Sequence, residues 1–160
     1  MIILGIDPGT ARIGYAIVNK NSGGVDLLGY GCLELKSQTQ IERLKNISDS
    51  IAELISEYHP EILAIEKLFF TKNAKTAFAV SEARGVIINA ANSLNLKISE
   101  FTPLEVKIAV TGYGKAEKQQ VQKMVCNILK LKKVPRPDDA ADAIAIALAA
   151  CYTNPKLKYG

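Results

Sequence analysis

The chain has 160 residues, a formal net charge of +4, and 48% hydrophobic and 22% charged residues. This length is typical of one domain that buries its own core without needing disulfides or a structural metal. The longest apolar stretch, Ala143–Tyr152, is shorter than the roughly 18 residues of a membrane span. Three cysteines without a CxxC pair are typical of reduced thiols, and the N-terminal apolar run is broken at Asp7. These features exclude a signal peptide and a disulfide scaffold, and predict a cytoplasmic protein.

The first third of the sequence predicts an antiparallel meander. Short turns separate three apolar segments, and Gly23 and Gly24 favour a hairpin because glycine readily adopts positive φ. The predicted strands are Ile2–Ile6, Ile13–Val18 and Val25–Leu35.

Helices and strands alternate in the rest of the chain. Apolar residues spaced three and four apart predict a helix from about Gln38, which Pro60 ends. The later predicted elements are a strand at Glu61–Glu66, a helix at Ala74–Leu94, a strand at Lys97–Phe101, and helices from Pro103 to about Val110, at Glu117–Leu129 and at Asp138–Tyr152. The order predicts an α/β fold, with a five-stranded mixed sheet and helices packed on it. We expect one domain over residues 1–153 and a short basic tail at 154–160.

The helix at Ala74–Leu94 is apolar around much of its circumference near Val86–Ala91. One apolar stripe is enough to cover a single core, so the excess predicts a second buried face, such as a homodimer contact. Gly85 lowers helix propensity, and we interpret it as a point of close packing.

Four acidic residues stand where a carboxylate is unfavourable. Asp7 and Glu66 end apolar strands, while Asp139 and Asp142 lie near the start of the Ala-rich last helix. If the first and fourth strands are neighbours, Asp7 and Glu66 emerge at the same edge of the sheet. Asp139 and Asp142 share one helix face, although Asp138 has an equally suitable spacing from Asp142. Such a cluster of oxygen ligands suits Mg²⁺, and two such ions suit phosphodiester hydrolysis.

Each acid taken alone also has a purely structural interpretation. Asp7 with Pro8 and Gly9 is typical of a turn, and Asp138 or Asp139 is typical of a helix N-cap. Glu66 is able to pair with its neighbour Lys67 at the surface. The joint placement of the acids at element ends favours the metal site over these separate explanations.

Basic residues are frequent in the predicted loops and helix starts, as expected of a protein that neutralises DNA phosphates. An ordinary solvated surface is the alternative. The adjacent Phe69 and Phe70 suit either core capping or stacking on an unpaired base. His59, the one histidine, receives no catalytic role. The basic residues are Lys72, Lys75, Lys107, Lys115, Lys118, Lys123, Lys130, Lys132, Lys133 and Arg136.

Five short segments in order resemble the RuvC-type Holliday junction resolvases, which belong to the RNase H-like nuclease superfamily. The resemblance extends over almost the whole chain. The segments are Gly5-Ile6-Asp7-Pro8-Gly9-Thr10 with Gly14-Tyr15, Ile65-Glu66-Lys67-Leu68-Phe69, Glu82-Ala83-Arg84-Gly85, Gly112-Tyr113-Gly114-Lys115-Ala116-Glu117-Lys118, and Asp139-Ala140-Ala141-Asp142-Ala143.

The resemblance implies roles for particular residues. Asp7, Glu66, Asp139 and Asp142 are implied as the catalytic, metal-binding acids, and the pattern Asp-Ala-Ala-Asp-Ala favours Asp139 over Asp138. The resemblance also implies a DNA-binding set, namely Phe69, Arg84, Lys107, Lys115 and Lys118.

The activity implied is that of a Mg²⁺-dependent endodeoxyribonuclease. It resolves four-way DNA junctions in recombination and repair by paired symmetric incisions that leave 5′-phosphates. Two Mg²⁺ ions are expected, with Mn²⁺ as a substitute, and the implied partners are a second copy of the chain and branch-migration proteins of the RuvA and RuvB type. The alternatives are a related nuclease acting on an RNA precursor, an actin-like ATPase, and a catalytically silent junction-binding module.

Overall fold

The computed structural model describes residues 1–35, 39–67 and 74–153, which form a five-stranded mixed sheet covered by helices. The strand order is β3-β2-β1-β4-β5, antiparallel from β3 to β1 and parallel from β1 to β5. The meander and the pairing of the first and fourth strands are thus confirmed. The strands are β1 (Ile2–Pro8), β2 (Arg12–Asn21), β3 (Gly24–Glu34), β4 (Ile62–Glu66) and β5 (Lys97–Phe101).

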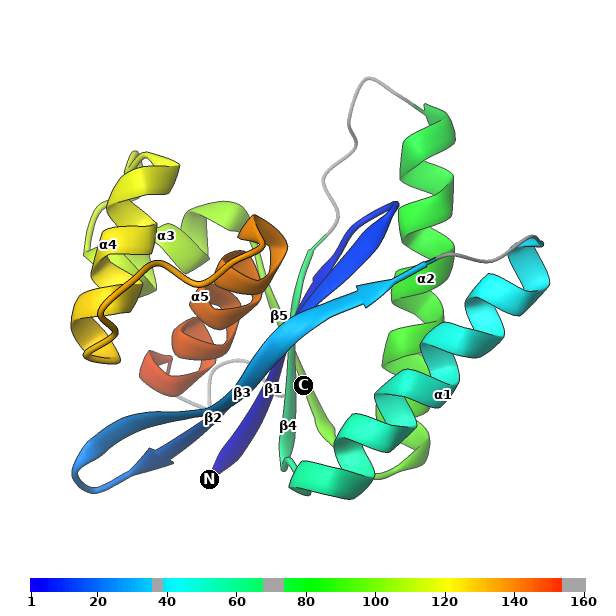
Figure 1. The fold of residues 1–160 in the computed structure, drawn as a ribbon, viewed down its shortest axis with the longest axis horizontal. Helices are drawn as coiled ribbons and strands as arrows, with labels where there is room; N and C mark the ends of the chain where they lie inside the picture. Colours follow the sequence, from blue (N-terminus) through cyan, green and yellow to red (C-terminus); the bar gives the residue numbers. More distant parts are fainter. Residues whose placement is uncertain (36–38, 68–73, 154–160) are drawn as a thin grey trace.

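Helices cover both faces of the sheet (Figure 1). One face carries α1 (Gln40–Tyr58) and α2 (Ala74–Ser93). The other carries α3 (Pro103–Thr111), α4 (Lys118–Ile128) and α5 (Asp138–Tyr152). No helix in the described ranges has the length and apolarity needed to cross a membrane.

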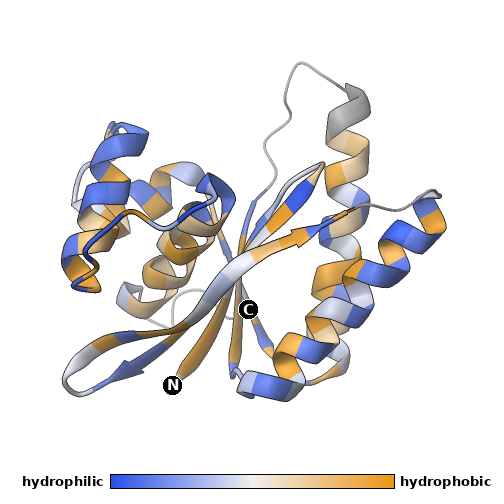
Figure 2. Ribbon diagram, in the orientation of Figure 1, coloured by the Kyte–Doolittle hydropathy of each residue, from blue (hydrophilic) through white to orange (hydrophobic). Residues whose placement is uncertain are grey.

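Apolar residues on the two faces form two separate cores, and the helices turn their hydrophobic sides towards the sheet (Figure 2). The strand β1 divides its side chains between them, because successive residues of a strand point to opposite faces. Ile3 belongs to the core beneath α5, whereas Leu4 and Ile6 belong to the core beneath α1 and α2. Each fully buried side chain of this size contributes about 1.5–3 kcal/mol to stability.

Local signals set the helix ends within a residue or two of the predicted bounds. Thr39 and Thr102 each close a capping box at the starts of α1 and α3. Helix α1 ends at His59, which adopts the left-handed conformation (φ 48°) directly before Pro60. In the β2–β3 hairpin, Gly24 has positive φ (139°), whereas Gly23, for which positive φ was also predicted, does not.

The close packing predicted at Gly85 is not seen among the residues that the structure describes. Gly85 is exposed on α2, and a Cβ atom added there meets no other atom within 4 Å. The glycine therefore leaves open space on the outer side of α2, with no described element of the chain packed against it.

Helix α5 packs closely against the sheet, and two strand glycines permit it. A Cβ atom on Gly5 would lie 2.4 Å from the carbonyl oxygen of Ala143 and 2.7 Å from Cβ of Ala147. A Cβ atom on Gly14 would lie 2.0 Å from the carbonyl oxygen of Asp139. The helix backbone thus rests directly on β1 and β2, which fixes the height of its first turn above the sheet.

Replacement of Gly14 by alanine is expected to destabilise the fold, because the added methyl group collides with the backbone of α5 and not with a movable side-chain tip. Overpacking of this kind typically costs about 1–3 kcal/mol. Urea unfolding measures the loss. Gly23→Ala is the matched control, since its Cβ meets only the side-chain oxygen of Asn21, at 3.3 Å. Equal unfolding free energies for the two variants would contradict the close contact.

Candidate metal centre

Asp7 and Glu66 lie at the same edge of the sheet because β1 and β4 run parallel and in register. Gly5 pairs with Ala64 and Ile6 with Ile65, so the two acids follow at the next position of each strand. Alternation then turns both side chains towards the face that carries α5, since Ile6 and Ile65 belong to the opposite core. The structure thus confirms the predicted convergence of these two strand ends.

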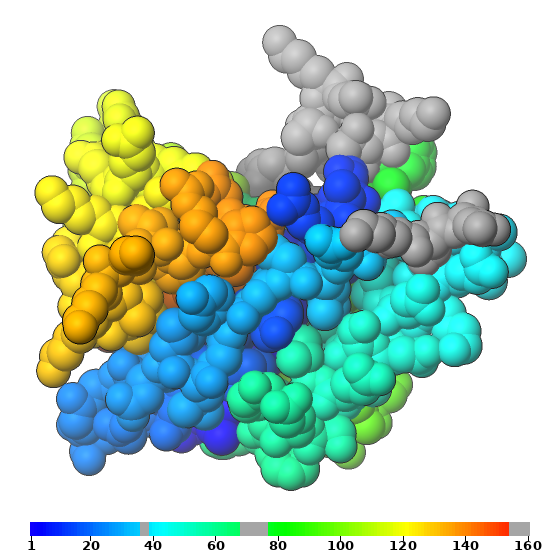
Figure 3. All heavy atoms as spheres, viewed as in Figure 1, coloured from blue at the N-terminus to red at the C-terminus, as the bar shows by residue number. Residues whose placement is uncertain are grey.

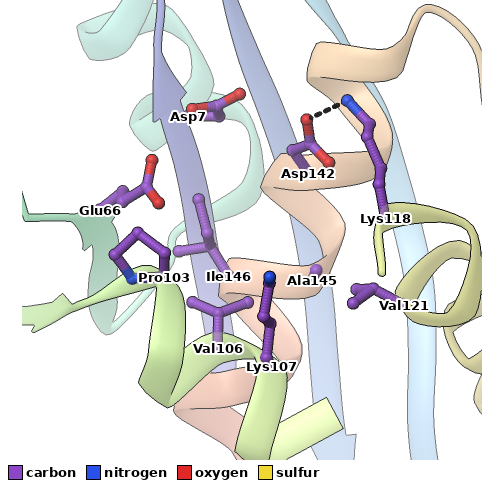
Figure 4. Close-up of a pocket in the computed structure, with 10 residues that line it drawn as sticks. All are labelled: Asp7, Glu66, Pro103, Val106, Lys107, Lys118, Val121, Asp142, Ala145 and Ile146. Carbon is purple, nitrogen blue, oxygen red and sulfur yellow. Dashed lines mark hydrogen bonds and ion pairs between the residues drawn. The ribbon is translucent and has the colours of Figure 1, made fainter. Parts of the chain in front are cut away.

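Helix α5 brings Asp142 to the same place. Asp7, Glu66 and Asp142 line one cavity, and their carboxylates lie around its upper part in Figure 4. Asp139 lies one turn earlier, where its backbone contacts Gly14, the residue that pairs with Asp7 across β1 and β2. Figure 3 shows the start of α5 (orange) beside the end of β1 (blue) at the surface. Because Gly14 pairs with Asp7, the contact between Asp139 and Gly14 explains why the charge of Asp139 raises the pKa of Asp7.

Burial and like charges perturb the acids. Burial, followed by the charges of Glu66, Asp142 and Asp139, raises the pKa of Asp7 from 3.8 to about 7, against a smaller lowering by Lys118. Burial, followed by the charge of Asp142, also raises the pKa of Glu66. Asp7 lies near the end of a strand between two layers of helices. A negative charge is therefore less favourable on Asp7 than on Glu66.

Lys118, the first residue of α4, neutralises part of this charge. Its ammonium group donates a hydrogen bond of 2.8 Å to Oδ2 of Asp142 and lies 3.5 Å from Oδ2 of Asp138. The hydrogen bond with Asp142 is the main cause that raises the pKa of Lys118. Asp138 also pairs with Arg136 in the segment before α5. Asp138 and Asp142 thus contact basic groups, and the charges of Asp142 and Asp139 also act on Asp7.

The remaining walls of the cavity are largely apolar. Lys107 of α3 and Lys118 both line it (Figure 4), so two lysines and three acids share one pocket. Apolar side chains restrict water around the acids and strengthen their electrostatic interactions. The other lining residues are Pro103, Val106, Val121, Ala145 and Ile146.

The other residues predicted to bind DNA have different positions. Lys115 is exposed in the loop between α3 and α4 and does not line the cavity. Arg84 lies on α2, and its guanidinium group bonds to the backbone of Glu66 and to the side chain of Glu100. Phe69 lies outside the described residues.

Sequence reasoning missed the apolar walls and the two glycines beneath α5. Val106 and Val121 have the spacing of ordinary core residues, and nothing in their local sequence separates a cavity wall from a core. Gly5 and Gly14 carried a usable signal, since glycine inside a strand often marks a close backbone approach.

The acids fit a divalent cation in charge and ligand type. Carboxylate oxygens are the ligands that Mg²⁺ prefers, and the raised pKa of Asp7 reflects its burial and the neighbouring negative charges, which a bound cation offsets. Within the described ranges, no three His, Cys, Asp or Glu side chains are arranged so that they could already hold an ion. Ion binding therefore requires the carboxylate side chains to rotate. It also requires Asp142 to bind the ion with its other oxygen or to break its hydrogen bond with Lys118.

A mixed sheet of this order, with acids at the ends of its two central strands and on the helix above them, defines the class of RNase H-like nucleases. Residues 3–150 match the family described as "Crossover junction endodeoxyribonuclease RuvC". A relative of that name from Moorella thermoacetica is 51% identical over 155 residues, covering 96% of this chain and 92% of the relative. One from Halothermothrix orenii is 48% identical over 155 residues, covering 96% and 93%.

Among solved structures, Thermus thermophilus RuvC in complex with a Holliday junction substrate aligns with a TM-score of 0.89. It is 34% identical, and the alignment covers 95% of this chain and 93% of that one. The chain belongs to the RuvC family of crossover junction endodeoxyribonucleases.

The raised pKa of Asp7 predicts a pH-dependent stability for the metal-free protein. Because the folded-state pKa of about 7 lies above the ordinary 3.8, the folded protein holds the proton more tightly, and stability falls as pH rises from about 4 to 7. Asp7→Asn removes this penalty. In EDTA at pH 8, we expect the variant to exceed the native protein in unfolding free energy by roughly 2–4 kcal/mol.

Urea unfolding at pH 4 and pH 8 provides the measurement, and the gain should vanish at the lower pH. Asp49→Asn is the control, since Asp49 pairs with Lys45 on the exposed side of α1, across the sheet from the cluster. A gain for Asp7→Asn that is the same at both pH values would contradict the electrostatic origin.

Proposed function

We propose that this protein is a structure-specific endonuclease that resolves four-way DNA junctions by paired incisions, using magnesium ions held by Asp7, Glu66, Asp139 and Asp142. One observation carries the proposal. Carboxylates from β1, β4 and α5 share a cavity with Lys107 and Lys118 in a chain that belongs to the RuvC family. The related Thermus protein, whose structure was solved with a Holliday junction substrate, supports the choice of DNA.

The residues of the cavity divide the work of hydrolysis. Magnesium, when bound, activates a water molecule and stabilises the leaving oxygen of an in-line displacement, which yields a 5′-phosphate. Asp7 and Glu66 hold the ions from the rigid sheet, and Asp142 and Asp139 hold them from the first turns of α5. Lys107 and Lys118 attract the phosphate backbone, and release of Asp142 frees the Lys118 ammonium for a phosphate oxygen. The apolar wall limits competing water.

Asp7→Asn is expected to abolish cleavage of a synthetic four-way junction while leaving junction affinity within about threefold, because it removes a metal ligand and no basic contact. Gel assays of binding and cleavage with Mg²⁺ measure both quantities. Asp49→Asn, on the exposed surface of α1, should cleave like the native protein.

Duplex DNA and an RNA–DNA hybrid are tested beside the junction. Preferential cutting of the hybrid by the native protein would overturn the choice of substrate in favour of RNA processing. A native protein that binds the junction without cutting it in Mg²⁺ or Mn²⁺ would make the protein a binding module.

We also propose that residues 1–153 are the nuclease domain and that the protein acts as a homodimer through the outer face of α2. A four-way junction has two-fold symmetry, and a dimer presents two identical sites to its two opposed strands. The outer face of α2 carries Phe78, which is 72% exposed, and the open space at Gly85 allows a close approach of a second helix. We further propose branch-migration proteins of the RuvA and RuvB type as partners.

Phe78→Ser is expected to weaken dimerisation by at least tenfold, since a large apolar side chain near the centre of an interface typically contributes more than 1 kcal/mol. Sedimentation at micromolar concentration without DNA measures the change. Leu28→Ser is the control, because Leu28 is also exposed (45%) but lies on β3 at the far edge of the sheet. A native protein that sediments as a monomer would contradict the proposed dimer.

A further inference from the structure

Arg84 has contacts that differ from those of a surface residue awaiting DNA. Its side chain is only 17% exposed. Nε donates a hydrogen bond of 3.1 Å to the backbone carbonyl oxygen of Glu66, and Nη2 forms an ion pair with the carboxylate of Glu100. One guanidinium group, projecting from α2, thus bonds to the last residue of β4 and to a residue of β5.

The bonded carbonyl belongs to a proposed metal ligand. Glu66 is the final residue of β4, where it pairs with Phe101, and the N–H of Lys67 donates a hydrogen bond of 2.7 Å to the carbonyl oxygen of Phe101. Its side chain points into the cavity on the α5 face, while Arg84 approaches from the helix on the opposite face. Arg84 adds a charged donor to the carbonyl oxygen of the same peptide group, and this second contact restricts the direction of the attached carboxylate.

Glu100 sets the position of the guanidinium in turn. Glu100 of β5 pairs with Ile65 of β4. The next pair along the two strands is formed by Glu66 and Phe101. The planar guanidinium fork therefore spans two adjacent strands at one level of the sheet. Lysine is unable to reproduce this geometry, because an ammonium group is a compact charge without a fixed fork.

We propose that Arg84 is a positioning residue: held by Glu100, it fixes the backbone of Glu66 and thereby the affinity of the site for its metal ion. This rests on the proposed role of Glu66 as a metal ligand. It differs from the DNA contact expected for Arg84 from the sequence. Because Arg84 stands on α2 next to the outward-facing Gly85, the same helix carries the support of Glu66 and the proposed dimer face.

The two roles predict different Mg²⁺ affinities for the variants Arg84→Lys and Glu100→Gln. A DNA contact depends on positive charge, so Arg84→Lys should bind the junction normally and Glu100→Gln, which removes a negative charge, should bind it as well or better. A positioning role depends on the fork and its partner, so both variants should lose Mg²⁺ affinity, by about tenfold, as is typical when a group that orients a ligand is changed.

Calorimetric titration of the free protein with Mg²⁺ measures that affinity without any cleavage. Junction affinity at several salt concentrations and the Mg²⁺ dependence of cleavage complete the experiment. For both variants we expect weaker Mg²⁺ binding, a higher Mg²⁺ midpoint for cleavage, and unchanged junction affinity and salt dependence. Asp49→Asn, which breaks the exposed pair with Lys45 on α1, is the matched control and should change none of these.

Two outcomes would overturn the proposal. Unchanged Mg²⁺ affinity in both variants, with a lowered melting temperature alone, would make the Arg84–Glu100 pair structural only. Weaker junction binding and a salt dependence reduced by about one charge in Arg84→Ala, with Mg²⁺ affinity intact, would establish the DNA contact instead. If the native protein binds Mg²⁺ but cuts no junction, the proposed function fails while the role of Arg84 is still tested by the titration.

Discussion

The direct contact between α5 and the sheet is the constraint on which the rest of the structure depends. Carbonyl oxygens of the helix lie where Cβ atoms of Gly5 and Gly14 would otherwise stand. Any larger residue at these points raises the helix, because the backbone on both sides is already in contact. The first turns of α5 carry Asp139 and Asp142, so the height of the helix decides whether its acids reach those on β1 and β4. The cavity, its charge and its chemistry all follow from this approach.

Bringing these acids together opposes folding, and the surroundings of the cavity reduce the cost only in part. Burial and the neighbouring carboxylates raise the pKa of Asp7 to about 7, while Lys118 compensates Asp142 from one side. The apolar residues beside the acids increase their repulsion, because they keep the local dielectric low. An arrangement that weakens the metal-free protein while offering oxygen ligands is the expected signature of a site selected for binding a cation.

Helix α2 connects the site to the outer surface of the molecule. Arg84 turns inward to the end of β4, whereas Gly85, the next residue, faces outward over open space. A contact made on the outside of α2 is therefore one residue away from a group that holds the backbone of Glu66. Such an arrangement places the proposed subunit contact and the residue that bonds to the backbone of Glu66 on the same helix.

The sequence by itself determined the elements, their order and the acids. The last helix and β5 have the predicted bounds, because apolar periodicity, Pro103 and the Ala-rich segment act locally. The same is true of the convergence of Asp7 and Glu66, which needs only that two strand ends meet in a parallel pair.

Only the tertiary structure decided which groups the adjacent acids Asp138 and Asp139 act on and which partners Arg84 has. Asp138 and Asp139 both have a helical spacing that places them near Asp142, and the docking of α5 on Gly14 turns Asp138 towards Lys118 and lets Asp139 act on Asp7. The partners of Arg84 lie 16 and 18 positions away in the chain, on two different strands. Local patterns specify which face of an element is apolar. The rotation and depth at which two elements pack depend on the atoms of both elements. That packing geometry determines which partners each charged group contacts.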